Sequence, residues 1–231
     1  MANTPVPLKA IVFDFDGVIA NSEPLHFRTF REVLAPRGIA LTEADYYARY
    51  LGYDDQRAFE QMSSDAGQTW TADRIAGLMT EKARLMEALE RDVSVLFPGA
   101  ADAIRRAAGA FPIAIASGAI RAEIERTLVR EDLIRYFGAI VAAEDTPQSK
   151  PSPDPYLAAV DRLSSALGRR IVPHECAAIE DSAWGLESAR AAGLRTVAVA
   201  QTYASGLASA DLTVRSINDL DLGRLSALFS E

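Results

Sequence analysis

Two aspartates, Asp14 and Asp16, lie two residues apart directly after the apolar run Ala10-Ile11-Val12-Phe13, and Gly17 follows them. The run predicts a buried strand, where an unpaired carboxylate would cost several kcal/mol. We therefore expect the pair to leave the strand at its end and to line a site. There one carboxylate could attack or bind a metal ion while the other handles a proton. A turn closed by an Asx hydrogen bond is the structural alternative.

Polar residues also follow later apolar runs, namely Ser117-Gly118, Lys150 and Glu180-Asp181. In an open parallel sheet, ligands bind outside the carboxyl ends of the strands, so these residues are expected to converge on one crevice. Each has an ordinary structural reading when it is taken alone. Ser117-Gly118 could be a plain strand-to-helix turn, Lys150 a solvated side chain, and Glu180-Asp181 a helix cap. Their common place at strand ends favours a site.

Together these residue types suit phosphoryl transfer. Asp14 would be the nucleophile, because a carboxylate is ionised at neutral pH and would form an acyl phosphate that water can cleave. Asp16 would protonate the leaving alkoxide and then deprotonate the attacking water. Its neighbouring carboxylates would raise its pKa toward the value that this role needs.

An anionic nucleophile and an anionic phosphate repel, so a cation must lie between them. Asp14 and Asp181, with a backbone carbonyl near Asp16, offer the hard oxygen ligands that Mg²⁺ prefers. Ser117 and the Gly118 amide would donate hydrogen bonds to phosphoryl oxygens. Lys150 would supply fixed positive charge in a chain whose net charge is −8.

The elements that must position these residues alternate in type. Continuous apolar runs predict five buried strands, at Lys9–Phe15, 113–116, 139–142, 177–179 and 196–200. Amphipathic segments predict helices at 99–108, 121–129, 153–167 and 184–192, with Ser152 as the N-cap of the third and Gly193 ending the fourth. This order predicts a doubly wound parallel α/β sheet.

One long stretch between the first two strands contains no strand pattern. It predicts helices near residues 25–34, 42–50, 55–66 and 71–89, the last with Thr71 as its N-cap. A crossover between parallel strands needs only one helix, so we expect a small helical domain inserted after the first strand. The expected division is a catalytic core of residues 1–20 and 97–231 and a helical domain of residues 21–96.

Composition narrows the function. The 231 residues are 49% hydrophobic and acidic overall, which supports a sizeable core and argues against binding to nucleic-acid phosphates. A single cysteine, Cys176, excludes an intrachain disulfide and a cysteine-rich metal site. The sequence has neither a signal-peptide pattern nor an apolar run long enough to span a membrane. We therefore expect a cytoplasmic protein that acts on a small molecule, without membrane or nucleic-acid partners.

The motifs resemble those of the haloacid dehalogenase superfamily over nearly the whole chain. These motifs are Asp14-Phe15-Asp16-Gly17-Val18, Ser117-Gly118, Lys150-Pro151-Ser152-Pro153-Asp154-Pro155-Tyr156, and Glu180-Asp181-Ser182 with Gly185 and Ala189. The insert is similar to the four-helix cap of the subgroup that contains phosphoglycolate phosphatases and β-phosphoglucomutase.

The resemblance implies a Rossmann-like core, Mg²⁺ and an aspartyl-phosphate intermediate. It implies that Asp14 is the nucleophile, Asp16 the acid and base, and Asp181 a metal ligand. Ser117 and Lys150 would be phosphate ligands, and Glu180 would be associated with the metal, directly or through water. The founding dehalogenases lack an aspartate at the place of Asp16, so its presence points to phosphate chemistry.

The sequence motifs are shared by phosphatases and phosphosugar mutases, so other residues must distinguish these two activities. The segment Ser22–Arg28 resembles both groups, and its His26 could lie near the leaving group or be a structural histidine. A mutase needs cap cations for a second phosphate, for which Arg57 and Lys82 are candidates. Asp54 and Asp55 disfavour a bisphosphate, so we expect a phosphatase for small phosphate monoesters such as sugar phosphates. A non-catalytic ligand-binding module is a third reading, which the presence of Asp14, Asp16, Lys150 and Asp181 disfavours.

Overall fold

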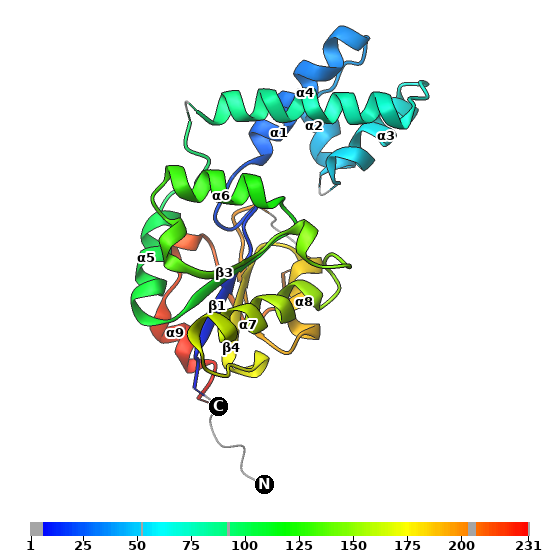
Figure 1. Cartoon of the computed structure of the whole chain (residues 1–231). Coiled ribbons are helices and arrows are strands. Elements are labelled where there is room, and N and C mark those ends of the chain that lie inside the picture. The colour runs from blue at the N-terminus through cyan, green and yellow to red at the C-terminus, as the bar shows by residue number, and fades with distance from the viewer. Residues whose placement is uncertain (1–6, 52, 92, 203–206, 231) are drawn as a thin grey trace. The chain divides into compact units, whose positions relative to one another are not determined.

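The computed structural model describes residues 7–51, 53–91, 93–202 and 207–230 (Figure 1). The chain divides into two compact units. The sheet unit contains residues up to Asn21 and residues from Val95 onward, and the helical unit contains residues 22–94.

The sheet unit contains one parallel sheet of six strands in the order β3-β2-β1-β4-β5-β6. The strands are β1 (Ala10–Phe13), β2 (Ile113–Ala116), β3 (Phe137–Val141), β4 (Cys176–Glu180), β5 (Arg195–Val199) and β6 (Leu212–Val214). The predicted doubly wound parallel fold is therefore confirmed, with a helical insert after β1. The sixth strand was not predicted, because three residues that include a central threonine give too short an apolar pattern.

Four predicted helices alternate with the strands of the sheet unit, and a short fifth helix after β6 was not predicted. They are α5 (Ala100–Ala110), α6 (Arg121–Arg130), α7 (Asp154–Leu167), α8 (Ala183–Ala191) and α9 (Leu222–Ala227), with 3-10 turns at Ile134–Tyr136, Ala143–Asp145, Pro173–Glu175 and Ile217–Asp219. Gly193, at φ 89°, follows the end of α8 as predicted. The N-cap of α7 is Pro153 and not Ser152, whose hydroxyl instead accepts a weak 3.4 Å hydrogen bond from the Asp154 amide.

The two faces of the sheet are covered by different helices. Alternate strand residues such as Ala10, Val12 and Ala178 pack with Tyr156 and Leu163 of α7 in one buried cluster, which also includes Ala189 of α8. Figure 1 shows α5 on the other side of the strands from α7. Burial on both faces explains why the strands are continuously apolar.

The helical unit consists of α1 (Glu23–Leu34), a 3-10 turn (Ala35–Arg37), α2 (Glu43–Asp45), a π-helical turn (Tyr46–Tyr50), α3 (Asp55–Asp65) and α4 (Ala72–Glu90). Thr42, Asp54 and Thr71 begin α2, α3 and α4 by accepting a hydrogen bond from the backbone amide three residues on, which confirms Thr71 as an N-cap. A separate apolar core, which includes Phe30 and Phe59, fills this unit. In the described part of the chain, no helix is both long and apolar enough to cross a membrane.

Candidate active site

The register of the central strands places two acidic residues side by side. Phe13 of β1 lies opposite Ile179 of β4, and the Asp14 amide continues the ladder with a 2.9 Å hydrogen bond to the Ile179 carbonyl. Asp14 and Glu180 are therefore neighbours at the carboxyl ends of adjacent strands. Side chains two residues apart on a strand lie on the same face of the sheet, so Asp14 shares a face with Val12 and Glu180 shares one with Ala178. Both acidic residues therefore lie on the face that α7 and α8 cover.

Lys150 joins these two carboxylates. Its Nζ lies 2.7 Å from Asp14 Oδ1 and 2.6 Å from Glu180 Oε1, and its side chain is only 8% exposed. Burial lowers the pKa of Lys150, but the charges and hydrogen bonds of Asp14 and Glu180 outweigh burial and raise it. Lys150 therefore remains charged through the neutral range.

Glu180 is fully buried and accepts hydrogen bonds on both oxygens. Lys150 and the Tyr156 hydroxyl, at 2.7 Å, donate to Oε1. The Asp181 amide and the Ser182 hydroxyl, both at 3.2 Å, donate to Oε2. A carboxylate offers about four lone-pair sites, so these donors use the full capacity of Glu180. This arrangement fits a residue that orients Lys150, and the predicted association of Glu180 with a metal ion stays a proposal.

A cluster of buried acidic groups could hold a cation. Asp14, Glu180 and Asp181 each present a carboxylate oxygen, and these three oxygens lie within 4.8 Å of one another. Among the described residues, the cluster contains three carboxylates, and the ammonium group of Lys150 pairs with two of them, which leaves an excess of two negative charges when all three are ionised. A divalent cation would balance that excess, and hard carboxylate oxygens suit Mg²⁺. The donor set therefore fits the expected metal.

Burial, together with the neighbouring negative charges, shifts the pKa values of the two aspartates in the cluster. Burial raises the pKa of Asp14 well above its usual range, Lys150 opposes that rise, and Glu180 and Asp181 add to it. Burial and the charge of Glu180 raise the pKa of Asp181 to about 7, against the opposing hydrogen bond with Thr202. A cation bound here would favour the ionised forms of both aspartates.

Asp16 and Gly17 form the turn that follows β1. Asp16 is half-buried, and its charge is one of those that raise the pKa of Asp181. Its carboxylate is not part of the three-residue acidic cluster, so its predicted contribution to the metal site stays a proposal. Gly17 has φ 80°, and a Cβ there would lie 1.8 Å from Asp181 Oδ2. The glycine therefore allows both the turn and the close approach of Asp181.

Ser117 and Gly118 follow β2 at the same edge of the sheet. The Ser117 amide donates to the Val141 carbonyl at 3.0 Å, which fixes the start of this loop against the end of β3. The Ser117 hydroxyl oxygen accepts from the Ala119 amide at 3.0 Å, so its O–H can donate elsewhere. Gly118 is exposed, and a Cβ there would meet no protein atom within 4 Å.

The two other predicted site residues, His26 and Arg57, belong to the helical unit. His26 Nδ1 lies 2.8 Å from Nζ of Lys82, which is buried and pairs with Asp55 at 2.5 Å. Burial and the positive charge of Lys82 lower the pKa of His26 well below its usual range, so His26 is neutral. Arg57 is exposed and stacks over the Tyr53 ring, 4.3 Å from its centroid. Their part in catalysis stays a proposal.

Sequence reasoning did not assign roles to Tyr156, Gly185 and Gln201. Tyr156 supports Glu180, and a Cβ at Gly185 would lie 2.1 Å from the Glu180 carboxylate. Gln201 Nε2 donates at 2.9 Å to the carbonyls of Gly17 and Val18, which holds the turn after β1. Tyr156 and Gly185 stand inside the recognised motifs, so a signal for them existed, whereas Gln201 carries no local pattern.

Comparisons with known proteins place this fold and site in a family. The sequence model of the haloacid dehalogenase-like hydrolases matches residues 8–193. Protein CbbY of Rhodobacter capsulatus is 32% identical over 206 residues, which covers 86% of this chain and 88% of that protein. The fructose-1-phosphate phosphatase YqaB of Escherichia coli (strain K12) is 30% identical over 203 residues, 82% of this chain and 95% of that protein.

A solved structure gives the same result. CbbY of Rhodobacter sphaeroides, in a mutant form in complex with xylulose-(1,5)bisphosphate, matches with a TM-score of 0.79 and 27% identity over 92% of this chain and 96% of that one. The chain belongs to the haloacid dehalogenase-like hydrolases, as its motifs predicted.

Proposed function

We propose that this protein is a Mg²⁺-dependent phosphatase that hydrolyses small phosphate monoesters through an aspartyl-phosphate intermediate. The observation that carries the proposal is the buried cluster of Asp14, Lys150, Glu180 and Asp181 at the carboxyl edge of the sheet. An aspartate that only closed a turn after β1 would need neither the buried Lys150 as a partner nor Glu180 and Asp181 as neighbours. Asp14 in this setting has the ion pair and the neighbouring acidic ligands that attack on phosphorus requires.

In the first step, an oxygen of Asp14 forms a bond to phosphorus while the ester P–O bond breaks. Asp16 gives its proton to the leaving alkoxide, as an acid placed two residues from the nucleophile. Lys150 and the Ser117 hydroxyl donate to phosphoryl oxygens and stabilise their charge. Mg²⁺, held by Asp14 and Asp181 with a carbonyl at Asp16, would offset the repulsion between carboxylate and phosphate.

In the second step, Asp16 takes a proton from water as the water oxygen attacks phosphorus. The bond between phosphorus and Asp14 breaks, which restores the Asp14 carboxylate and releases inorganic phosphate. Glu180 takes no direct part, because its oxygens already accept from Lys150, Tyr156 and the following turn. Its proposed work is to hold Lys150 in place.

The proposed substrates are phosphorylated sugars or similar metabolites. One relative is named as a fructose-1-phosphate phosphatase, and a CbbY structure contains a sugar bisphosphate, so both kinds belong in a substrate panel. Helical-unit residues would supply specificity, with His26 and Arg57 as the candidate substrate contacts. We expect a small-molecule partner and propose no nucleic-acid or membrane partner.

A phosphosugar mutase of the β-phosphoglucomutase type is the second candidate, because the helical unit contains a buried cation, Lys82. Asp55 already pairs with Lys82, and Asp54 caps α3 through the Arg57 amide. The pairing of Lys82 lowers its capacity to balance a second phosphate, which favours hydrolysis. Asp54 and Asp55 therefore have local partners in the helical unit and are not two free repelling charges.

The test is a phosphate-release assay across sugar phosphates, sugar bisphosphates and other small monoesters, with Mg²⁺ and with a chelator. Hydrolysis predicts free phosphate with Mg²⁺ only, and none from Asp14→Asn, which is expected to stay folded. A sugar isomer formed without free phosphate, with or without a bisphosphate primer, would identify the mutase. Full activity in Asp14→Asn would reject the nucleophile, and no activity on any substrate would reject the enzyme.

A further inference from the structure

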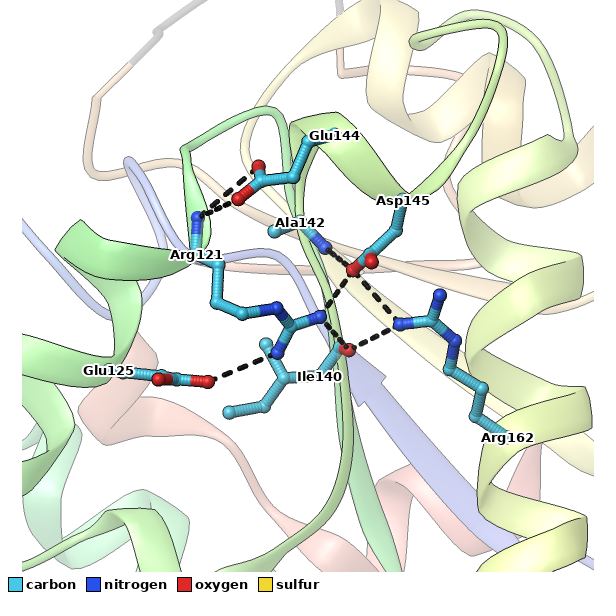
Figure 2. A network of polar contacts seen from close by, with 7 residues as sticks. All are labelled: Arg121, Glu125, Ile140, Ala142, Glu144, Asp145 and Arg162. Atoms are coloured by element: carbon cyan, nitrogen blue, oxygen red, sulfur yellow. Dashed lines mark hydrogen bonds and ion pairs between the residues drawn. The ribbon is translucent and has the colours of Figure 1, made fainter.

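A second polar network lies beside the proposed phosphate site, on the edge strand β3. Figure 2 shows the Arg121 and Arg162 guanidinium groups approaching Asp145 and the Ile140 carbonyl from two sides. The Ile140 carbonyl accepts from Arg121 at 3.1 Å and from Arg162 at 3.0 Å. Asp145 pairs with Arg121 and, at 2.9 Å, with Arg162, and it accepts from the Ala142 amide at 2.8 Å.

The arginines come from the two elements that follow the proposed phosphate ligands. Arg121 is the first residue of α6, three residues after Gly118. Arg162 lies in α7, the helix that follows Lys150. Asp145 lies between these two elements in the sequence, in the 3-10 turn after β3. One carboxylate therefore connects the loop that carries Ser117 with the helix that follows Lys150.

Backbone contacts reinforce this connection. The N-cap residue of α6 is Ile120, which has no side-chain acceptor, and the Glu144 carboxylate instead accepts from the Arg121 amide at 3.0 Å (Figure 2). The Ala143 amide donates to the Ala119 carbonyl at 2.9 Å. The first turn of a helix needs such acceptors for its free amides, and Glu144 supplies one of them to α6. The loop before α6 is thereby fixed at both ends.

The charge state of Asp145 suits a permanent link. Burial raises its pKa, but the hydrogen bonds from Arg162 and Ala142 and the charge of Arg121 outweigh burial and lower it to about 2. One terminal nitrogen of each guanidinium group contacts both the Asp145 carboxylate and the Ile140 carbonyl, so each arginine links a side chain to the backbone of β3. Covering the Ile140 carbonyl also satisfies an acceptor on a sheet edge.

We propose that Glu144 and Asp145, with Arg121 and Arg162, are positioning residues that hold the Ser117-Gly118 loop at its working distance from Lys150. The proposal rests on the proposed function, because it takes Ser117 and Lys150 as the phosphate ligands. None of the four residues needs to touch the substrate. Their effect on the reaction is to reduce the freedom of two loops that must act on one phosphoryl group.

The main test is Asp145→Asn, with Asp211→Asn as the matched control. Asp211 also accepts from a backbone amide, that of Thr196, at 2.7 Å, and also lies near an arginine, Arg195, at 3.5 Å. It lies beside the first residues of β5, at the opposite end of that strand from the proposed site. Both variants lose one charged acceptor, and Asp145→Asn is expected to lower the melting temperature more, because Asp145 pairs with two arginines and Asp211 with one at 3.5 Å.

Only Asp145→Asn is expected to disturb phosphate binding. We expect kcat/KM for phosphate release to fall about tenfold and competitive inhibition by inorganic phosphate to weaken by a similar factor. Kinetics and phosphate inhibition like those of Asp211→Asn would overturn the proposal and reduce the network to a structural role. If Asp145→Asn does not fold, Arg162→Gln replaces it, because that variant removes only the exposed arginine that pairs with Asp145. Its kcat/KM and its inhibition constant for inorganic phosphate are then compared with those of Asp211→Asn.

Hydrogen exchange separates this proposal from the proposed function. The amides of residues 117–121 are expected to exchange faster in Asp145→Asn and at the wild-type rate in Asp211→Asn. If the wild-type protein released no phosphate from any substrate, the phosphatase would be rejected, while this comparison would still decide whether Asp145 holds the loop. Equal exchange in the two variants would overturn the positioning role.

Discussion

Replacing Gly185 by alanine tests how tightly Glu180 is held. Gly185 lies in the first turn of α8, and a Cβ there would lie 2.1 Å from the Cδ, Oε1 and Oε2 atoms of Glu180. Such contacts do not occur below 3.0 Å, so the carboxylate must move by about 1 Å. That movement breaks the short bonds from Lys150 and Tyr156, at 2.6 and 2.7 Å.

Two opposing effects determine the size of the change. Alanine is favoured over glycine within a helix by about 1 kcal/mol. Disrupting a buried ion pair costs about 3–5 kcal/mol when one charge loses its partner. Gly185→Ala is therefore expected to lower the free energy of unfolding by about 2–4 kcal/mol. Activity should fall by about 100-fold, because Lys150 is misplaced by a distance comparable with that movement.

Gly109→Ala is the control, because Gly109 lies in α5 and a Cβ there would meet no atom within 4 Å. It is expected to raise the free energy of unfolding by up to about 1 kcal/mol and to leave activity unchanged. Urea unfolding and phosphate release measure both variants. If Gly185→Ala were as stable and as active as Gly109→Ala, Glu180 would not be confined as described and its role as the anchor of Lys150 would fail.

Three further predictions concern the same unit. Mg²⁺ at about 100 times its Kd should stabilise the wild-type protein by about 2.7 kcal/mol in thermal unfolding. Asp181→Asn should raise the melting temperature of the metal-free protein and abolish the stabilisation by Mg²⁺. Full stabilisation of that variant by Mg²⁺ would exclude Asp181 as a metal ligand. Tyr156→Phe removes a hydrogen bond to a buried carboxylate and should cost about 1.5–3 kcal/mol in urea unfolding; a loss near zero would mean that Glu180 does not need this donor. The pKa of Asp145 is lowered in the folded state, so the stability that its ionised form contributes is complete above pH 3.8 and is lost as the pH falls toward about 2. The free energies of unfolding of wild type and Asp145→Asn should therefore converge between these pH values. A difference in stability that stayed constant over this range would contradict the ion pairs of Asp145.

The sequence predicted the layered architecture because burial on both faces makes parallel strands continuously apolar. Five strands and the helical insert were predictable on that basis. β6 was not, since Leu212–Val214 depends on pairing with β5 for its strand structure. The motif residues could be named because each follows an apolar run, so that topology alone puts Asp14, Lys150 and Glu180 at one edge of the sheet.

The contacts that support the site could not be read in the same way. Tyr156 is 24 residues from Glu180, and Gln201 is 184 residues from Gly17, so neither pair shares a helix or strand period. The pairing of Lys82 with Asp55 was missed for the same reason, and Asp55 was interpreted as a free repelling charge. Local patterns predict where a residue lies along its own element, whereas its partner depends on how separate elements pack.

The hydrogen-bonding capacity of Lys150 explains why Glu180 belongs in a phosphate site although the substrate is itself anionic. An ammonium group has three N–H donors, and Asp14 and Glu180 accept two of them. Glu180 is held by its own donors and cannot follow the lysine, so it fixes the direction of the remaining N–H. Under the proposed function, that N–H is the one that meets a phosphoryl oxygen, beside the oxygen of Asp14 that attacks phosphorus. A lysine paired with Asp14 alone would be free to rotate away from the substrate, which is why a second, fully buried carboxylate is needed to hold it.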